Sequence, residues 1–278
     1  MTADTAVTWL FVPGNRPERF DKAARSGADR VIVDLEDAVT PAAKESARQS
    51  VVRWLSGGRT AWVRINGSAT PWHDHDLACL SDLPGLAGLV VPKAEDPADL
   101  DRIRQVVGGS TALVALIETA RGVRDAHRIA EFTPVARLAF GAIDFALDID
   151  AAETDQALLL ARSTLVVASR AAGKPAPLDG VTQELGDPRA AAGDAARARA
   201  LGFGGKLCIH PAQIAAVRSA FEPSAEEVEW ARRVLEHAEG PGAGVTPDGQ
   251  FVDKPVVERA RRIVGRMDTE GRGHASAT

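Results

Sequence analysis

Short apolar runs alternate with longer amphipathic segments along most of this 278-residue chain. Because the runs are apolar throughout, they predict strands that are buried on both faces, as in a parallel sheet. Segments with helical spacing separate the runs, and eight such units predict a (β/α)8 TIM barrel, which the chain length fits. The expected strands are residues 8–13, 30–36, 61–66, 87–93, 112–118, 137–143, 176–180 and 205–210.

An open, doubly wound sheet is the alternative arrangement for the same alternation of strands and helices. The chain has no glycine-rich dinucleotide fingerprint after its first expected strand, so the barrel is favoured. The GFGGK stretch at 202–206 faintly resembles a phosphate loop. It precedes a strand instead of joining a strand to a helix, so it is better explained as a helix cap.

The alternation changes near the C-terminal end of the chain. An extra helix is expected at 223–240, and the glycine- and proline-rich stretch at 241–250 indicates a mobile loop. A brief extended piece and a last amphipathic helix follow at 251–267, and residues 268–278 are expected to be disordered. We therefore predict a catalytic barrel domain over 1–222 and a C-terminal extension of helices with a lid segment over 223–278.

The composition is that of an ordinary globular protein, with 45% hydrophobic and 26% charged residues and a net charge of -5. This mild acidity gives no support to nucleic-acid binding as the main activity. The N-terminus lacks the features of a signal peptide, and no apolar run approaches the length of a membrane span. The two cysteines, Cys79 and Cys208, suit a reducing compartment, so we expect a cytoplasmic protein with no nucleic-acid or membrane partner.

Polar and charged side chains occur at the C-terminal ends of nearly all the expected strands. A TIM barrel carries its chemistry at this end, so these side chains would share one rim. One charged residue at a strand end is often a structural salt bridge, whereas this concentration indicates a functional site. Besides the aromatic Phe11, the residues are Arg16, Glu36, Asp37, Arg64, Asn66, Lys93, Glu118, Asp144, Asp179 and His210.

Glu118 and Asp144 form the sharpest pair on this rim. They lie about one strand-and-helix repeat apart, so they should occupy adjacent strands at the same height. Two carboxylates this close repel unless a cation lies between them, and oxygen ligands suit Mg²⁺. The alternative is a metal-free arrangement in which Glu118 pairs with Arg64 or Lys93.

Arg64 is a candidate clamp for a substrate carboxylate, because a guanidinium group matches a carboxylate in a bidentate fork. The alternative is that it pairs with Glu36 or Asp37. Arg16 and Lys22 flank the first expected helix, whose N-terminal N–H groups would help them to hold phosphates. A role as ordinary surface charge is an equally economical interpretation of these two residues.

The WHDHD stretch at 72–76 offers His73 and His75 as further metal ligands. Nothing nearby in the sequence completes a ligand set. A solvated helix N-terminus is therefore favoured, in keeping with the aspartates that are common there.

The ordered set of motifs resembles the citrate lyase beta-subunit-like (CitE-like) family of CoA-ester lyases, within the HpcH/HpaI aldolase superfamily. Single motifs are weak, but the set is specific and covers about residues 9 to 267 in family order. The resemblance implies a TIM barrel, a Mg²⁺ cofactor and a CoA-thioester substrate. The matching stretches are LFVPGNRPERFDKA, VIVDLEDAV, VRING, VPKAE, LIETARG, FGAIDF, KLCIHP and FVDKPVVERARRI.

The resemblance also implies roles for individual residues. Glu118 and Asp144 match the family's metal ligands, and Arg64 matches its substrate-binding arginine. Asp253 matches a catalytic aspartate on a C-terminal lid that, in relatives, closes over a neighbouring subunit's site, which implies a homo-oligomer, often a trimer. The other matches are Glu36 and Asp37, an acidic pair near the metal, and Phe11, Arg16, Lys22, Ile209 and His210, which contact substrate or CoA in relatives.

The implied reaction cleaves a 3-hydroxyacyl-CoA, such as malyl-CoA or citramalyl-CoA, into an acyl-CoA and a 2-oxo acid, or forms it from them. Arg64 would stabilise developing negative charge, and Asp253 would transfer a proton at the enolate carbon. The alternatives are an aldolase of free 2-oxo acids, a malate synthase-like condensation with thioester hydrolysis, and a non-catalytic CoA-ester binding protein. A citrate lyase beta subunit would also work beside an acyl-carrier subunit, for which the sequence displays no docking surface.

Overall fold

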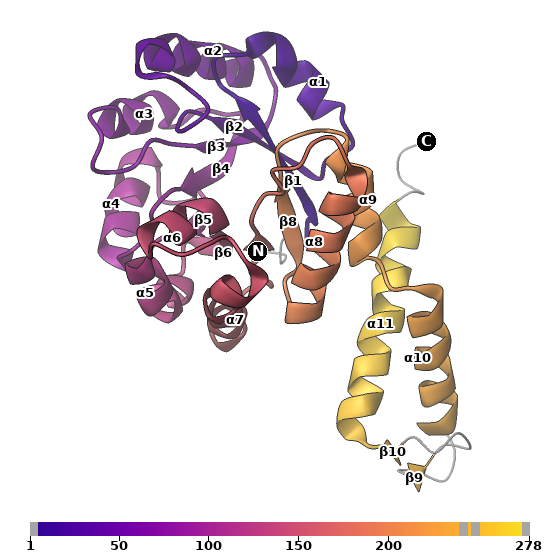
Figure 1. Ribbon diagram of the computed structural model, residues 1–278. Coiled ribbons are helices and arrows are strands. Elements are labelled where there is room, and N and C mark those ends of the chain that lie inside the picture. The colour runs from indigo at the N-terminus through magenta and orange to yellow at the C-terminus, as the bar shows by residue number, and fades with distance from the viewer. Residues whose placement is uncertain (1–4, 239–243, 246–250, 274–278) are drawn as a thin grey trace. The chain divides into compact units, whose positions relative to one another are not determined.

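The computed structural model describes residues 5–238, 244–245 and 251–273, with side chains as far as residue 265. Parallel strands close into a barrel in which β1 pairs with both β2 and β8 (Figure 1). This confirms the predicted TIM barrel and excludes the open sheet. The strands are β1 (Thr8–Pro13), β2 (Arg30–Asp34), β3 (Ala61–Arg64), β4 (Leu86–Val91), β5 (Leu113–Ile117), β6 (Val135–Phe140), β7 (Leu178–Asp179) and β8 (Gly205–Cys208).

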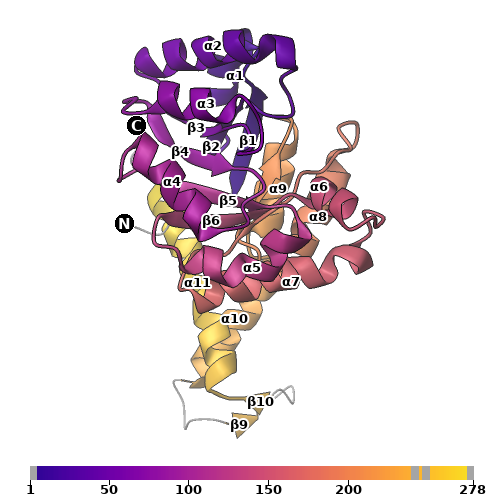
Figure 2. The same cartoon turned by 90° about the vertical axis from the view of Figure 1, so that its left-hand side faces the viewer.

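Helices form a layer outside the ring of strands, as the two views in Figures 1 and 2 show. One helix start bears directly on the site, because Thr119 follows Glu118 and caps α5 by accepting the N–H of Gly122 at 3.0 Å. The helices of this layer are η1 (Pro17–Arg19), α1 (Phe20–Ala24), η2 (Pro41–Ala43), α2 (Lys44–Ser56), α3 (His73–Leu80), α4 (Pro97–Val107), α5 (Ala120–Glu131), α6 (Ala142–Asp148), α7 (Asp155–Ala171), α8 (Pro188–Leu201) and α9 (Gln213–Phe221).

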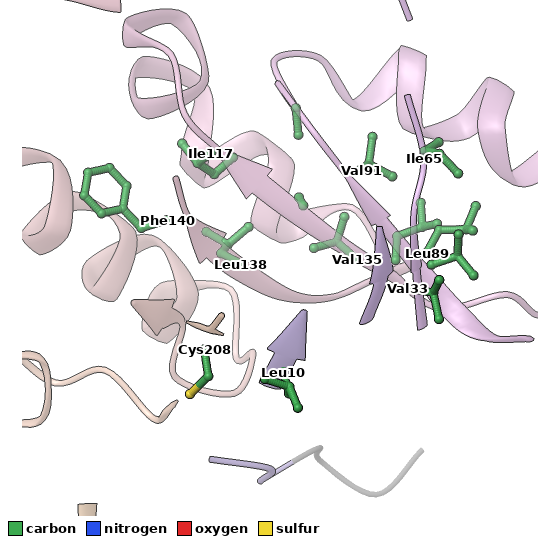
Figure 3. Close-up of a cluster of buried hydrophobic side chains, with 14 of the residues drawn as sticks. Leu10, Val33, Ile65, Leu89, Val91, Ile117, Val135, Leu138, Phe140 and Cys208 are labelled. Carbon is green, nitrogen blue, oxygen red and sulfur yellow. The ribbon is translucent and has the colours of Figure 1, made fainter. Parts of the chain in front are cut away.

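The larger part of the core lies between the strands and the helices. Figure 3 shows outward-facing strand residues such as Val33, Leu89 and Leu138, which are fully buried. This layer holds the helices onto the barrel by burying apolar side chains on both sides. It explains why the strands are apolar along their whole length.

A second, smaller core fills the interior of the barrel. Trp9 and Trp62 are buried there with their ring centroids 5.0 Å apart, beside Ile32 and Leu116. Because side chains alternate along a strand, residues two positions after an interior residue also point inward. Those residues are Asp34, Arg64 and Glu118, which follow Ile32, Trp62 and Leu116 at the C-terminal end of the barrel.

The N-terminal end of the barrel is closed by Arg137, which is only 2% exposed. Its Nε donates to the carbonyl oxygen of Ala176 at 2.7 Å, and its Nη1 donates to that of Ala6 at 2.6 Å. The indole N–H of Trp9 also donates to Ala6, at 3.2 Å. This end therefore satisfies a buried charge with backbone carbonyls that precede the strands.

The chain divides after Phe221 into two compact units, and the second is an antiparallel helical hairpin. Its helices are α10 (Ala225–Ala238) and α11 (Lys254–Gly273), with β9 (Gly244–Val245) paired to β10 (Phe251–Val252). Val228, Ala231, Val234, Val252 and Ala260 form a core of its own. The two helices predicted near 223–240 and within 251–267 are thus present. Their role as a lid stays a prediction.

Two expectations for this part of the chain have a different outcome. Helix α11 continues to Gly273, so residues 268–273 are helical and the prediction of disorder is wrong there, while 274–278 lie outside the described residues. The mobile loop predicted at 241–250 also lies outside them, except for 244–245. Within the described part of the chain, no helix is long and apolar enough to cross a membrane.

Candidate active site

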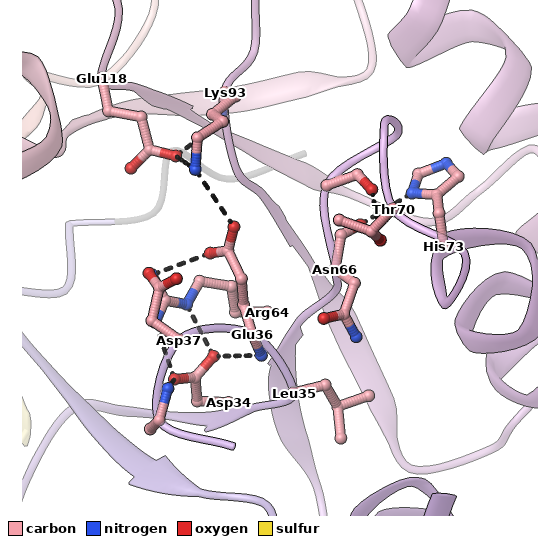
Figure 4. Close-up of polar contacts among 12 residues, drawn as sticks. Asp34, Leu35, Glu36, Asp37, Arg64, Asn66, Thr70, His73, Lys93 and Glu118 are labelled. Carbon is pink, nitrogen blue, oxygen red and sulfur yellow. Dashed lines mark hydrogen bonds and ion pairs between the residues drawn. The ribbon is translucent and has the colours of Figure 1, made fainter. Parts of the chain in front are cut away.

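The C-terminal end of the barrel gathers charged side chains from consecutive strands. Figure 4 shows Asp34, Glu36, Arg64, Lys93 and Glu118 directed toward one another from β2, β3, β4 and β5 and the turns that follow them. Parallel strands all end on the same rim, so the sequence spacing predicted this convergence. These groups differ in how completely hydrogen bonds and opposite charges compensate their burial.

Arg64 is held mainly by Asp34. Its Nε and Nη2 each lie 2.7 Å from one oxygen of the Asp34 carboxylate, which also accepts the backbone N–H groups of Glu36 and Ala38. Burial alone would raise the pKa of Asp34, but the charge and hydrogen bonds of Arg64 outweigh it and lower that pKa. The bidentate face of Arg64 is therefore already occupied by a carboxylate of the protein.

Asp34 is the residue that the sequence reading missed. The alternative partners that the sequence offers for Arg64 are Glu36 and Asp37, and both lie near its Nη1 only, at 3.0 Å and 3.2 Å. Asp34 lies inside an apolar run that predicts a strand, and a charge in such a run is itself a signal of a buried ion pair. The ring of Phe11 covers the other side of Arg64, with its centroid 4.9 Å from the guanidinium carbon.

Glu118 immediately follows β5 and carries a carboxylate that is only 2% exposed. Its Oε1 accepts the backbone N–H of Lys93 at 2.8 Å and lies 3.8 Å from the Lys93 ammonium. Burial, together with the negative charges of Glu36 and Asp144, raises the pKa of Glu118 to about 8. The buried carboxylate is thus under-compensated. Asp144 lies in the first turn of α6 and not on β6, where the sequence pattern placed it, and its charge still acts on Glu118.

Gly141 makes room for this carboxylate. A Cβ atom at position 141 would lie 2.4 Å from Glu118 Oε2 and 2.6 Å from its Cβ. Gly141 follows β6 and precedes α6, the short helix that carries Asp144 in its first turn. The absence of a side chain at this one position lets the Glu118 carboxylate approach the start of α6.

Glu36 is the second under-compensated carboxylate. Burial is the main cause that raises its pKa to about 7; the positive charge of Arg64 opposes this, and Asp37 adds to it. Its Oε2 is buried and accepts no hydrogen bond from the residues that the structure describes, although Arg64 Nη1 is 3.0 Å away. Such an oxygen usually indicates a missing partner.

Oxygen ligands with excess negative charge suit a hard divalent cation. Glu36, Glu118 and Asp144 share their surroundings with the Lys93 ammonium, and the raised pKa values of the first two carboxylates report incomplete compensation. No three His, Cys, Asp or Glu side chains among the described residues are grouped closely enough to enclose a metal alone. Mg²⁺ needs no such cage, since it keeps waters and takes substrate oxygens, so the residues fit it.

A cavity of about 330 Å³ lies beside the C-terminal ends of β1 and β8. Phe11, Lys22, Ile209 and His210 line it, so four of the six residues expected to contact substrate or CoA are brought together, and Arg64 is not part of this lining. Arg16 does not line it, because its Nε is bound to Glu18 at 2.7 Å on the surface. Arg19 takes that place, and the sequence offered no signal to separate these neighbouring arginines.

Two other candidates differ from expectation. His73 begins α3 as predicted, but it is 9% exposed rather than solvated, and its Nδ1 lies 2.8 Å from the carbonyl oxygen of Asn66. Asp179 does not join the rim, because Leu178 points into the barrel and Asp179 points outward to Arg162 at 3.0 Å. It is a structural ion pair between β7 and α7.

Asp253 lies in the second unit, immediately before α11. Its Oδ1 accepts the N–H of Val256 at 3.1 Å, which is the geometry of a helix N-cap. The side chain is half-buried. This contact explains an aspartate here without catalysis, so the catalytic role of Asp253 stays a prediction.

Comparison with known proteins gives consistent results. The sequence model of the HpcH/HpaI aldolase/citrate lyase family matches residues 8–211. A citrate lyase subunit beta-like protein of Deinococcus radiodurans is 38% identical over 92% of this chain and 95% of its own. A (3S)-malyl-CoA thioesterase of Cereibacter sphaeroides is 31% identical over 93% of both chains.

A solved structure with a similar fold is the protein CitE of Mycobacterium tuberculosis in complex with magnesium, acetoacetate and coenzyme A. It superposes with a TM-score of 0.83 at 35% identity, covering 95% of this chain and 98% of that one. The agreement in length and identity extends over both units of the chain, not the barrel alone.

Proposed function

Since the chain belongs to the HpcH/HpaI aldolase/citrate lyase family, we propose that it is a Mg²⁺-dependent carbon–carbon lyase acting on a 3-hydroxyacyl-CoA. Cleavage gives a shorter acyl-CoA and a 2-oxo acid, and the reverse reaction condenses them. One observation carries the proposal: a buried, under-compensated carboxylate at Glu118 stands with Asp144 on the same rim as a cavity lined by basic side chains.

Glu118 and Asp144 are the proposed ligands of the cation, and Glu36 supports them with an oxygen that lacks a hydrogen bond. Bound Mg²⁺ would supply Lewis-acid activation of substrate carboxylate and hydroxyl oxygens. Gly141 keeps the Glu118 carboxylate in place by leaving room for it. The magnesium in the M. tuberculosis CitE structure supports this choice of cation.

Arg64 supplies fixed positive charge at the centre of the rim. Because Asp34 binds Nε and Nη2, the guanidinium plane is held in one orientation, with Nη1 directed toward Glu36 and Asp37. A guanidinium that is already oriented stabilises the negative charge of an enolate without reorganisation when the bond breaks. Its proposed role is therefore charge stabilisation rather than a bidentate grip on the substrate.

The cavity beside Phe11 is the proposed site of the CoA arm. Arg19 and Lys22 bring two positive charges to it, and phosphates are the anionic part of a CoA thioester. An aldolase of free 2-oxo acids would have no use for this cavity, which is why the thioester substrate is favoured. The CoA in the M. tuberculosis CitE structure gives independent support.

Condensation followed by hydrolysis of the 3-hydroxyacyl-CoA thioester is the second candidate function. The similarity to a (3S)-malyl-CoA thioesterase favours it, at 31% identity over nearly the whole chain. Both reactions use the same proposed groups on the rim, and they differ in the release of free CoA. We also propose a homo-oligomer, a trimer by resemblance, in which Asp253 transfers a proton at a neighbouring subunit's site.

Product analysis by mass spectrometry tests these proposals. The purified protein is incubated with malyl-CoA, methylmalyl-CoA, citramalyl-CoA and citryl-CoA, with and without Mg²⁺. We expect a shorter acyl-CoA and a 2-oxo acid from at least one substrate, only with the metal; free CoA would indicate the thioesterase. No product from a folded protein across the whole panel would contradict the CoA-ester lyase.

Variants locate the activity. Glu118→Gln should remove it, whereas Glu131→Gln, which changes an exposed carboxylate at the end of α5, should leave it intact. Size-exclusion chromatography with light scattering tests the trimer, and Asp253→Asn should lower turnover without dissociating the oligomer. A monomer with full activity would exclude the lid exchange.

A further inference from the structure

Lys93 places one ammonium group between two carboxylates of the rim. Its Nζ lies 3.6 Å from Glu36 Oε1 and 3.8 Å from Glu118 Oε1 (Figure 4). Both distances exceed that of a hydrogen bond, so the ammonium is attracted by charge without being fixed in one geometry. The side chain is 49% exposed, which leaves it free to move.

The backbone of Lys93 is held in an unusual conformation. Its φ is 47°, in the left-handed region that favours glycine, and its N–H donates to Glu118 Oε1 at 2.8 Å. Strain of this kind persists where surrounding contacts enforce it, and it is concentrated at functional sites. The chain thus presents a lysine, not a glycine, immediately beside the buried carboxylate.

Arg64 does not compensate Glu118 in the same way. Arg64 is bound to Asp34 through two nitrogens, and its remaining nitrogen lies beside Glu36 and Asp37. Among the described residues, the ion pair of Glu118 is with Lys93 alone. The ammonium therefore lies beside one oxygen of each carboxylate, close enough for its charge to oppose the binding of a divalent cation.

Building on the magnesium site proposed above, we propose that Lys93 is a built-in counter-ion that competes with the divalent cation for Glu36 and Glu118. In the free protein it neutralises part of their charge and lowers their affinity for metal. When a cation binds, the half-exposed ammonium is displaced toward solvent. Lys93 would then set the metal affinity of this site without being a ligand.

The test is direct binding of Mn²⁺, a spectroscopic substitute for Mg²⁺, followed by electron paramagnetic resonance of the free ion, with no substrate present. A unit charge removed from about 4 Å in nearly aqueous surroundings changes an affinity by about fivefold. We therefore expect Lys93→Met and Lys93→Gln to bind Mn²⁺ at least about fivefold more tightly than the wild type. Lys93→Arg, which keeps the charge, should stay within about twofold.

Two controls separate this effect from other causes. Lys174→Met removes the same charge from a lysine that binds the carbonyl oxygens of Phe132 and Thr133, and it should not change Mn²⁺ binding. Glu118→Gln should abolish binding and so show that the ion occupies this site. Thermal unfolding of each variant confirms that it is folded.

The outcomes are distinct. Equal or weaker binding by folded Lys93→Met and Lys93→Gln would overturn the counter-ion role while the magnesium site stands. If neither the wild type nor the Lys93 variants bind Mn²⁺, the magnesium site and the counter-ion role are both wrong. Tighter binding by both neutral variants, with Lys93→Arg unchanged, would establish the inference whatever the substrate of the enzyme is.

Discussion

The barrel buries charge at both of its ends, and the two ends treat it differently. At the N-terminal end, Arg137 donates to the carbonyl oxygens of Ala6 and Ala176 at hydrogen-bond distance. At the C-terminal end, Glu118 and Glu36 are buried with too little positive charge around them, and burial raises the pKa of each. The N-terminal end compensates its charge with backbone carbonyl groups, whereas the C-terminal end leaves negative charge that a bound cation could compensate.

The difference separates stability from function within one fold. Removing a hydrogen-bonded buried charge lowers stability, because its partners are left buried without a hydrogen bond. A buried carboxylate without enough compensating charge itself lowers stability, so it is retained for another reason. The Arg64–Asp34 pair shows that the C-terminal end is also able to satisfy charge fully where a rigid group is needed. The contrast therefore follows individual residues, not the rim as a whole.

The largest expected effect is that of Glu118→Gln on turnover. Losing a proposed metal ligand removes several kcal/mol of transition-state stabilisation, so Mg²⁺-dependent kcat/KM should fall by about 1,000-fold or more. Without metal at pH 8, the free energy of unfolding should rise, because a neutral amide replaces a carboxylate that burial disfavours. Steady-state kinetics and urea unfolding measure the two effects, and a variant that is both active and less stable would reverse the assignment.

Arg137→Met should give the opposite result. It leaves the carbonyl oxygens of Ala6 and Ala176 short of a donor in a buried place, so the free energy of unfolding should fall by about 2–4 kcal/mol. Activity per folded molecule should stay within about twofold, since Arg137 closes the far end of the barrel. If Arg137→Met were as stable as the wild type, the hydrogen bonds of Arg137 would not stabilise the N-terminal end, and the contrast with the C-terminal rim would be lost.

The pH dependence of stability should also distinguish the ends. In the unfolded chain Glu36 and Glu118 lose their protons near the ordinary value of 4.5, whereas the folded protein keeps them up to a pKa of about 7 and about 8. The folded state thus binds more protons between these values, and its stability should fall as pH rises from about 4.5 to about 8. The slope approaches about 1.4 kcal/mol per pH unit for each retained proton.

Urea unfolding in EDTA across this range measures the slope. Glu118→Gln should remove most of the slope between pH 7 and pH 8, where the folded state retains mainly the proton of Glu118. Saturating Mg²⁺ at pH 8 should restore stability, since a cation that binds only the folded state stabilises it. A stability that is flat or rising over this range would show that the carboxylates are compensated after all.

The sequence allowed the fold to be predicted because the barrel repeats one local rule. Continuous apolar runs gave the strands, and the parallel arrangement then placed Glu36, Arg64, Lys93 and Glu118 on one rim. Partner choice was not predictable in this way. Arg64 could reach several carboxylates, and the apolar run does not reveal that Asp34, at the end of β2, binds both Nε and Nη2 while Asp37, in the turn after it, contacts only Nη1.

The direction in which a side chain points, into the barrel or toward the helices, was the second feature that the sequence did not predict. Asp179 was expected on the rim because it ends a strand, but a two-residue strand did not reveal that Leu178 faces the interior. Arg16 and Arg19 lie one helical turn apart, and only the three-dimensional course of η1 decides which lines the cavity. Such choices depend on side-chain directions that periodicity alone leaves open.

The smallest expected effect concerns Phe11, which joins the satisfied and the unsatisfied parts of the C-terminal end. Its ring lies 4.9 Å from the Arg64 guanidinium carbon and also lines the cavity. Phe11→Leu keeps an apolar side chain but removes the cation–π contact, which is worth about 0.5–1 kcal/mol in a partly exposed place. We expect kcat/KM to fall by about twofold to fivefold, whereas Phe11→Tyr, which keeps the ring face, should stay near the wild type. If both variants lost activity equally, the ring would serve the cavity rather than Arg64, and the orientation of Arg64 would depend on Asp34 alone.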